Sequence, residues 1–149
     1  MRLIIDGDGC PVVEQVIQLG ESYELEVIIV TSYAHYSQKY DKEGVSYIFV
    51  DVDNQMADYK IASMVQVGDV LITQDYGLAN ICLHKARVVH HMAFEFTLDN
   101  IERYLNERHV NAVNRRKHQK YTKIPPFTQE HRRQFYQFME EMIELDFNI

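Results

Sequence analysis

Short apolar runs of strand length alternate along this chain with segments of helical period, and this alternation constrains the fold more than any other feature. It is typical of βα units, in which each strand is followed by a helix that packs on a mostly parallel sheet. Several runs are almost continuous Val and Ile, as expected for strands that helices cover on both faces. The predicted strands are residues 2–5, 26–30, 46–50, 70–73 and 87–90.

The segments between these strands predict the covering helices. Pro11 is favoured at the first position of a helix and would begin the first one. Further helices are predicted over residues 56–65, after Asp75, and over residues 98–107. The polar, tyrosine-rich segment 31–44 is expected to be a loop at the ligand-binding edge. The apolar positions expected to face the core are Val12, Val16 and Leu19 in the first helix and Leu78, Ile81 and Cys82 in the third.

Two consecutive prolines, Pro125 and Pro126, interrupt the C-terminal part of the chain because they cannot continue a helix. Residues 110–127 are therefore predicted to be a basic connector, and residues 128–146 a last helix capped by Thr128. That helix carries an apolar stripe that would pack on the core: Phe135, Phe138, Met139, Met142 and Ile143. Residues 1–149 would form a single three-layer α/β/α domain with a mostly parallel sheet of four to five strands.

Acidic residues stand where several strands or their following helices reach one edge of the predicted sheet. Asp6 and Asp8 follow the first strand, Asp75 follows the fourth, and Asp58 opens the helix after the third. The carboxyl ends of parallel strands meet at one edge, where ligands bind in open α/β sheets. Asp69 is excluded, because it enters the strand that Asp75 leaves and would lie at the opposite edge. Each acid alone could be only a helix cap or a turn residue.

The joint placement of Asp6, Asp8, Asp58 and Asp75 points to a cation site, because crowded like charges weaken a fold unless a cation lies among them. Carboxylate ligands select a hard ion such as Mg²⁺ or Mn²⁺. A metal at this rim would activate a water molecule and polarise a phosphodiester, so hydrolysis of nucleic acid is the reaction that follows.

A basic stretch in an acidic chain provides a candidate nucleic-acid surface. The net charge is −7, yet residues 103–123 hold seven basic residues against one acid, with tyrosines between them. Such a segment can bind a nucleic-acid backbone and stack a base, although a solvated connector would have the same composition. The candidate binding residues are Arg108, Arg115, Arg116, Lys117 and Lys120.

The two cysteines and the apolar segments exclude several other classes of protein. Cys10 and Cys82 are too few for a disulfide framework, and no Cys/His spacing indicates a zinc site. Cys10 before Pro11 is either a small packing residue or a nucleophilic thiolate at a helix N-terminus. No run approaches the roughly 20 apolar residues that cross a bilayer, and the N-terminus lacks a signal-peptide layout, so a cytoplasmic protein without membrane contact is expected.

Five motifs together resemble the YaiI/YqxD family of uncharacterised bacterial proteins. They are DGDGCPV at residues 6–12, ADYKI at 57–61, GDVLITQDYGLA at 68–79, NIERYLNERH at 100–109 and PPFTQEHRRQF at 125–135. The resemblance covers nearly the whole chain, and TQDYGLA is its most specific part. The family is similar to the PIN-like superfamily, whose metal-dependent ribonucleases carry acids after the first strand, in a central helix and after the fourth strand.

This resemblance implies a PIN-like fold in which Asp6, Asp58 and Asp75 are ligands of Mg²⁺ or Mn²⁺ and Asp8 is an accessory ligand or base. RNA is the substrate that it implies. The chain departs from the family at two places: Gln55 stands where members have another acid, and KHQKYTKI at residues 117–124 replaces a glycine-rich turn. The first change affects metal affinity and the second the hold on substrate.

Two other functions fit part of the pattern. LIIDGDGCPV also resembles the opening motif of haloacid-dehalogenase-type phosphatases, with Asp6 as nucleophile, Asp8 as general acid and Thr31 or Ser32 as the phosphate-binding hydroxyl. That class needs an acid pair within one turn after a strand, whereas Asp69 and Asp75 bracket a strand. The other alternative is an RNA-binding or regulatory module that keeps the fold without catalysis.

Overall fold

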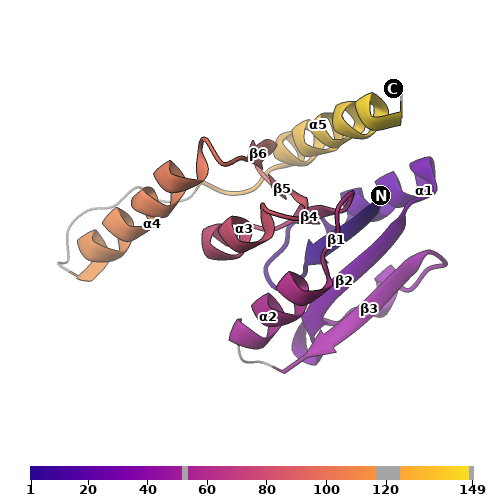
Figure 1. The fold of residues 1–149 in the computed structure, drawn as a ribbon. Coiled ribbons are helices and arrows are strands. Elements are labelled where there is room, and N and C mark those ends of the chain that lie inside the picture. Colours follow the sequence, from indigo (N-terminus) through magenta and orange to yellow (C-terminus); the bar gives the residue numbers. More distant parts are fainter. Residues whose placement is uncertain (52–53, 117–124, 148–149) are drawn as a thin grey trace.

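A six-stranded sheet forms the centre of the computed structural model, which describes residues 1–51, 54–116 and 125–147 (Figure 1). The strand order is β3-β2-β1-β4-β5-β6, and all neighbouring pairs are parallel except β5 and β6. A mostly parallel α/β sheet is therefore confirmed. The strands are β1 (Arg2–Asp6), β2 (Glu26–Ser32), β3 (Val45–Val50), β4 (Val70–Ile72), β5 (Arg87–His90) and β6 (Phe94–Phe96).

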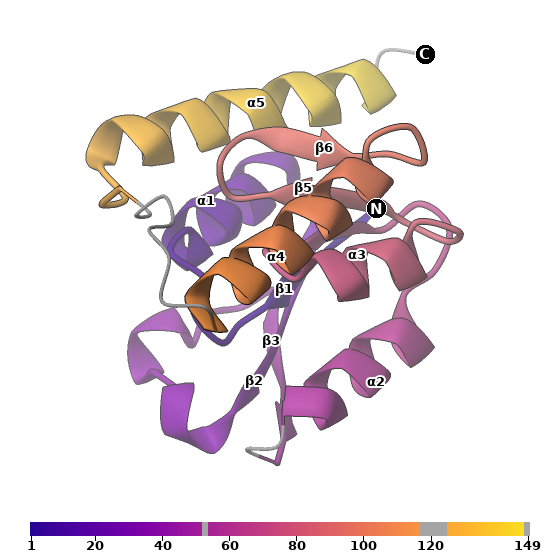
Figure 2. The ribbon, with the colours of Figure 1, turned by 90° about the vertical axis from the view of Figure 1, so that its left-hand side faces the viewer.

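Alternate residues of the central strands enter two separate cores, one on each face of the sheet. In β1, Leu3 and Ile5 pack on one face and Ile4 on the other, and all three are fully buried. The first face is covered by α1 (Val13–Tyr23) and α5 (Gln129–Phe147). The second face is covered by α2 (Asn54–Met64), α3 (Tyr76–Cys82) and the first turns of α4 (Ile101–Arg116) (Figure 2). The Val/Ile runs are nearly continuous because helices cover both faces of these strands, as the sequence predicts.

The expected strand number of four to five is wrong because β6 was missed. This strand is only three residues long and pairs antiparallel with β5 after a turn in which Ala93 has a positive φ of 66°. Strand β4 is equally short but continuously apolar, whereas Glu95 interrupts the apolar residues of β6, so the sequence gives no distinct strand signal there. Two details of the helices also differ: α1 begins at Val13 rather than Pro11, and Ile81 is 59% exposed, with Ala79 buried beside Leu78 and Cys82.

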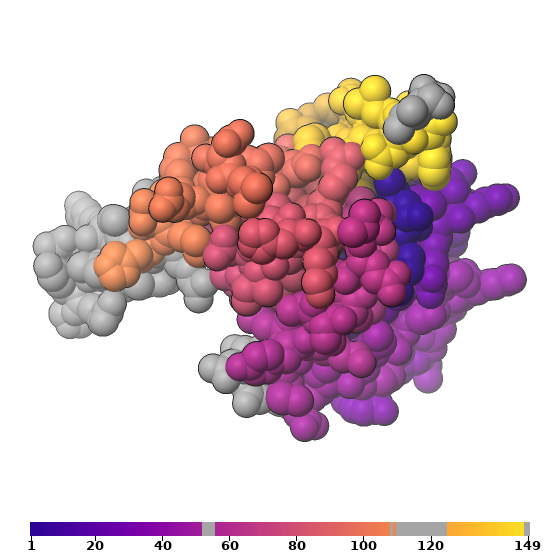
Figure 3. All heavy atoms as spheres, in the orientation of Figure 1, coloured from indigo at the N-terminus to yellow at the C-terminus, as the bar shows by residue number. Residues whose placement is uncertain are grey.

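The last helix agrees with the prediction. The backbone N–H of His131 donates to Thr128 Oγ1 at 3.2 Å, which caps α5, and the core face holds Phe135, Met139, Met142 and Ile143. Helix α4 instead runs nine residues past the predicted end at 107, through 110–116 of the predicted connector. Figure 1 shows the ribbon of α4 projecting from the body of the molecule, and Figure 3 shows its first turns against the body.

The tyrosine-rich segment after β2 is more ordered than the predicted loop. Strand β2 continues to Ser32, and two short 3₁₀ helices follow, η1 (Tyr33–His35) and η2 (Gln38–Tyr40), before β3 begins at Val45. No helix within the described ranges has the length and apolar character needed to cross a membrane.

Candidate functional site

The strand order reverses between β1 and β4, and the predicted site lies at the carboxyl ends of these two strands. From β1 the chain continues to β2 on one side, whereas β4 is followed by β5 on the other. Ligands of open α/β sheets bind at such a switch point. Asp6 is the last residue of β1, and Asp75 follows β4 as the N-cap of α3. The topology therefore brings these two carboxylates to the same point.

Thr73 connects the two acids directly. Its hydroxyl donates a hydrogen bond to Asp6 Oδ2 at 2.8 Å and accepts one from the backbone N–H of Asp75 at 3.0 Å. The Asp75 carboxylate in turn accepts from the backbone N–H of Leu78 at 3.1 Å, which caps α3. Thr73 thus holds the Asp6 carboxylate and the backbone of Asp75, and the first turn of α3 holds the Asp75 carboxylate.

Asp8 is held against the end of β2. Its Oδ1 accepts hydrogen bonds from the Thr31 hydroxyl at 2.6 Å and from the backbone N–H of Ser32 at 3.3 Å. The turn that carries Asp8 lies close to β2 because Gly7 has no side chain: a Cβ there would be 2.9 Å from Thr31 Cβ and 3.0 Å from the Val30 carbonyl oxygen.

His35 completes this group of side chains. Its Nδ1 lies 3.3 Å from Asp8 Oδ1 and 2.9 Å from Ser32 Oγ. Both contacts use the same ring nitrogen, so the three residues do not form the relay of a hydrolase triad, which needs both nitrogens.

The charges at this edge act on one another. The pKa of Asp6 is raised from its ordinary value of 3.8 to about 6, mainly by burial, with smaller contributions from the charges of Asp58, Asp75 and Asp8 and against the hydrogen bond from Thr73. The pKa of the Cys82 thiol is likewise raised to about 11, mainly by burial, with smaller contributions from the charges of Asp58 and Asp6. Asp58, on α2, therefore belongs to the same electrostatic neighbourhood as the acids of β1 and β4.

The donor chemistry suits a hard divalent cation, since all four candidate ligands are carboxylates. Within residues 1–51, 54–116 and 125–147, however, no three His, Cys, Asp or Glu side chains lie close enough together to form a ready-made ligand set. The acids are thus electrostatic neighbours whose side chains would have to turn toward one another to share an ion.

Several residues at this edge were not singled out from the sequence. A small hollow is lined by Asp6, Asp8, Cys10, Ile72, Thr73, Gln74 and His91. Burial and the neighbouring His131 lower the pKa of His91, which favours the neutral imidazole. Thr73 is the last residue of one predicted strand and His91 immediately follows another, and these positions at strand ends could have indicated both residues. Burial raises the pKa of the Cys10 thiol to about 12, so the packing cysteine is favoured over the reactive thiolate.

Asp69 lies at the opposite edge, as predicted. It is buried, and its Oδ2 is 2.7 Å from Arg2 Nη2 at the beginning of β1. It also accepts from the backbone N–H of Gln66 at 2.8 Å. Asp69 and Asp75 therefore cannot form the acid pair that a haloacid-dehalogenase-type phosphatase requires.

The candidate nucleic-acid-binding residues lie mostly beyond what the structure describes. Arg108, Arg115 and Arg116 are on α4, but only their backbone is described. Lys117 and Lys120 are outside the described residues, as is the side chain of Gln55. Figure 1 shows α4 projecting to the left and β3 running to the lower left, so the helix leaves the body on the side of the strand ends that carry the acids.

Comparisons with known proteins match nearly the whole chain to one family of bacterial proteins. The model of a family described as "Uncharacterized BCR, YaiI/YqxD family" matches residues 4–145. A UPF0178 protein from Enterococcus faecalis is 41% identical over 145 residues, covering 97% of this chain and 98% of its own, and one from Bacillus anthracis is 41% identical over 147 residues, covering 97% and 100%. The crystal structure of Rae1 (YacP) from Bacillus subtilis aligns with a TM-score of 0.46 and 19% identity, over 78% of this chain and 83% of its own.

Proposed function

This chain belongs to the YaiI/YqxD family, and from that premise we propose that it is a metal-dependent, nuclease-like protein that hydrolyses phosphodiester bonds, with RNA as substrate. The single observation that supports this function most is the link at the switch point, where the Thr73 hydroxyl donates to Asp6 Oδ2 and accepts from the backbone N–H of Asp75. Asp6 at the end of β1 and Asp75 at the start of α3 lie at a topological switch point, and the charges of Asp58, Asp75 and Asp8 all raise the pKa of Asp6. A divalent cation bound at this point would relieve that repulsion.

Asp6, Asp58 and Asp75 would hold the ion, which would supply Lewis-acid activation of the phosphodiester and of a water molecule. Thr73 would hold Asp6 in a fixed position relative to the start of α3 while the ion binds, because its hydroxyl bonds to both. Asp8, kept at the rim by Thr31 and Ser32, would accept the proton of the attacking water. RNA as the substrate rests on the basic composition of residues 103–123, whose helix α4 leaves the body on the same side.

The test is cleavage of a panel of single-stranded RNA, structured RNA and single-stranded DNA in the presence of Mn²⁺, Mg²⁺ or EDTA. Wild-type protein is expected to cleave RNA with Mn²⁺ or Mg²⁺ only, and Asp75→Asn is expected to lose at least about a hundredfold in rate, as for removal of a metal ligand or its partner. Asp99→Asn is the matched control, since Asp99 is an exposed residue in the turn before α4 and should cleave normally. Absence of cleavage by wild-type protein with both ions would refute the proposal.

A non-catalytic RNA-binding module is the second candidate. It is favoured because no three acidic, histidine or cysteine side chains among the described residues lie close enough together to bind one ion. The same panel separates the two functions. RNA binding that falls with salt, is insensitive to EDTA and is never followed by cleavage would establish the module in place of the nuclease.

A further inference from the structure

Four aromatic rings gather where the segment after β2 meets the edge strand β3. We call this cluster the aromatic platform; it consists of Tyr33, Tyr36, Tyr47 and Phe49. Tyr33 stacks on Phe49 with ring centroids 4.1 Å apart and an interplanar angle of 9°, and Tyr47 stacks on Phe49 from further along β3 at 5.5 Å and 4°. Tyr36 meets Tyr47 and Phe49 edge to face, at 4.9 and 5.4 Å.

The platform is both held in place and open. The hydroxyl of Tyr47 donates to the Ser37 carbonyl oxygen at 3.1 Å, which fastens the segment between η1 and η2 to β3. Tyr33 nevertheless has 74% of its surface exposed, although Phe49 covers one face of its ring. A ring kept in one orientation with its other face in water can receive a flat ligand at little further cost in conformational entropy.

The platform is connected through β2 to the acidic rim, the edge of the sheet that carries Asp6, Asp8, Asp58 and Asp75. Phe49 lies opposite Thr31 in the β2/β3 register, and Thr31 donates the 2.6 Å hydrogen bond to Asp8. Ser32, whose backbone N–H also binds Asp8, immediately precedes Tyr33. A ligand stacked on Tyr33 would therefore place its neighbouring groups beside Asp8.

The chemistry that fits this surface is an unpaired base. Aromatic side chains exposed beside a phosphodiester-processing site bind single strands by stacking, which works for any base because each has a π-face. Cations for the adjoining backbone come from the same region: Lys39 on η2 and Arg132 on α5 line a common groove with Cys10, two residues after Asp8 in the chain. A core role alone would not leave Tyr33 exposed.

We propose that the aromatic platform binds an unpaired base of a single-stranded nucleic acid and so presents the adjoining phosphodiester to the acidic rim. The presentation step rests on the proposed nuclease function, whereas base binding does not depend on catalysis. The site is thus specific for single-stranded over double-stranded substrate, because a base inside a duplex has no free face to offer.

The first experiment measures binding of a fluorescein-labelled oligoadenylate by anisotropy at low salt in EDTA, where no cleavage occurs. Tyr33→Ala should weaken binding about tenfold, while Tyr33→Phe, which keeps the ring, should bind like wild type. Phe147→Ala is the control: Phe147 is also an exposed aromatic residue, at 54%, but contacts Tyr23 at the other end of α1. Circular dichroism checks that each variant is folded.

The second experiment uses the absence of tryptophan from the chain. Tyr33→Trp introduces a single indole at the platform, and its fluorescence should be quenched by oligoadenylate and not by duplex RNA. Phe147→Trp, with the indole at the remote position, should show no quenching.

Unchanged affinity in Tyr33→Ala, equal loss in Phe147→Ala, or quenching of both indoles would overturn the inference. So would a change in self-association of Tyr33→Ala in sedimentation, since the platform would then be covered by a second copy of the chain. The outcome is separate from that of the nuclease test. Tyr33-dependent binding without any metal-dependent cleavage would support base binding by the platform and refute the nuclease function. Metal-dependent cleavage at the same rate in wild type and Tyr33→Ala would support the nuclease function and refute the role of the platform.

Discussion

Replacing Asp6 by Asn should stabilise the metal-free protein at neutral pH, although it removes a residue of the proposed active site. The native carboxyl has a pKa of about 6 against an ordinary value of 3.8, so at about pH 7 folding must carry an already ionised group into a largely buried position near other acids. That difference corresponds to a penalty of about 3 kcal/mol in the free energy of unfolding. An Asn amide must itself be partly desolvated, so we expect a gain of about 2 kcal/mol.

The sign of the pH dependence follows from proton binding. Between the two pKa values the native state binds more protons than the unfolded state, so the contribution of Asp6 to stability falls as pH rises from about 4 to about 6. Below that range the carboxyl is protonated in both states and the penalty vanishes. The advantage of Asp6→Asn should therefore be full at about pH 7 and nearly absent at about pH 4.

The assay is urea denaturation of wild type and Asp6→Asn in EDTA at both pH values, compared as differences so that other titrating groups cancel. Asp99→Asn, at an exposed site, should show no such pH-dependent difference. Addition of Mn²⁺ should reverse the order, because an ion that binds only the native wild-type site stabilises that protein alone. A destabilised Asp6→Asn at neutral pH, or an equal difference at both pH values, would refute the electrostatic account of this edge.

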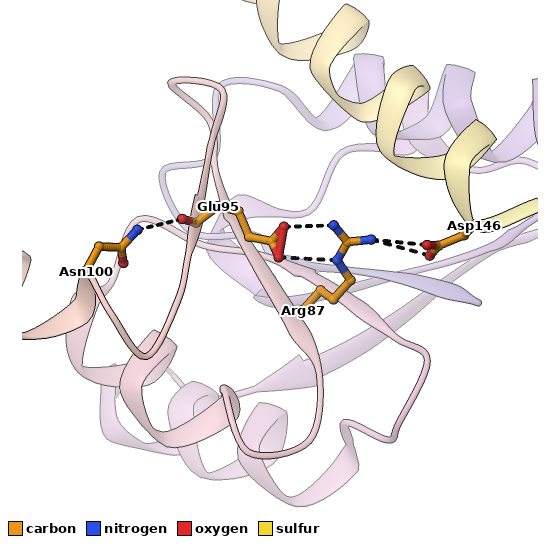
Figure 4. A network of polar contacts seen from close by, with 4 residues as sticks. All are labelled: Arg87, Glu95, Asn100 and Asp146. Atoms are coloured by element: carbon orange, nitrogen blue, oxygen red, sulfur yellow. Dashed lines mark hydrogen bonds and ion pairs between the residues drawn. The ribbon is translucent and has the colours of Figure 1, made fainter.

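Two further substitutions test contacts that hold the sheet and its turns. Arg87 forms a bidentate ion pair with Glu95 of β6, at 2.8 and 3.2 Å, and its guanidinium lies 3.3 Å from Asp146 of α5 (Figure 4). Arg87→Ala should lower the free energy of unfolding in urea by about 1 kcal/mol, whereas Arg133→Ala, at an exposed ion pair, should leave the urea midpoint unchanged. Gly7→Ala would force a Cβ to within 2.9 Å of Thr31 Cβ and should cost about 1–3 kcal/mol in thermal unfolding; a wild-type melting temperature would show that the turn can move away.

The periodic parts of the fold were predictable because burial sets the residue pattern: burial of both faces of a strand gives a continuous apolar run, and burial of one face of a helix gives an apolar stripe. Five strands and the apolar stripe of α5 were found in this way. The misses share one cause. Strand β6 is a three-residue run interrupted by Glu95, and Ile81 faces solvent from a helix of only seven residues, so neither element is long enough for a clear periodic signal.

The sequence by itself determined that the chain is a βα sheet with acids at the carboxyl ends of its strands, because side-chain periodicity and strand direction are local properties. Only the tertiary structure decided that β1 lies between β2 and β4, and hence that Thr73 bonds to Asp6 and Thr31 to Asp8. The rings of Tyr33 and Phe49 likewise meet only through the β2/β3 register. Contacts between distant segments depend on strand order and register, which no single stretch of residues encodes.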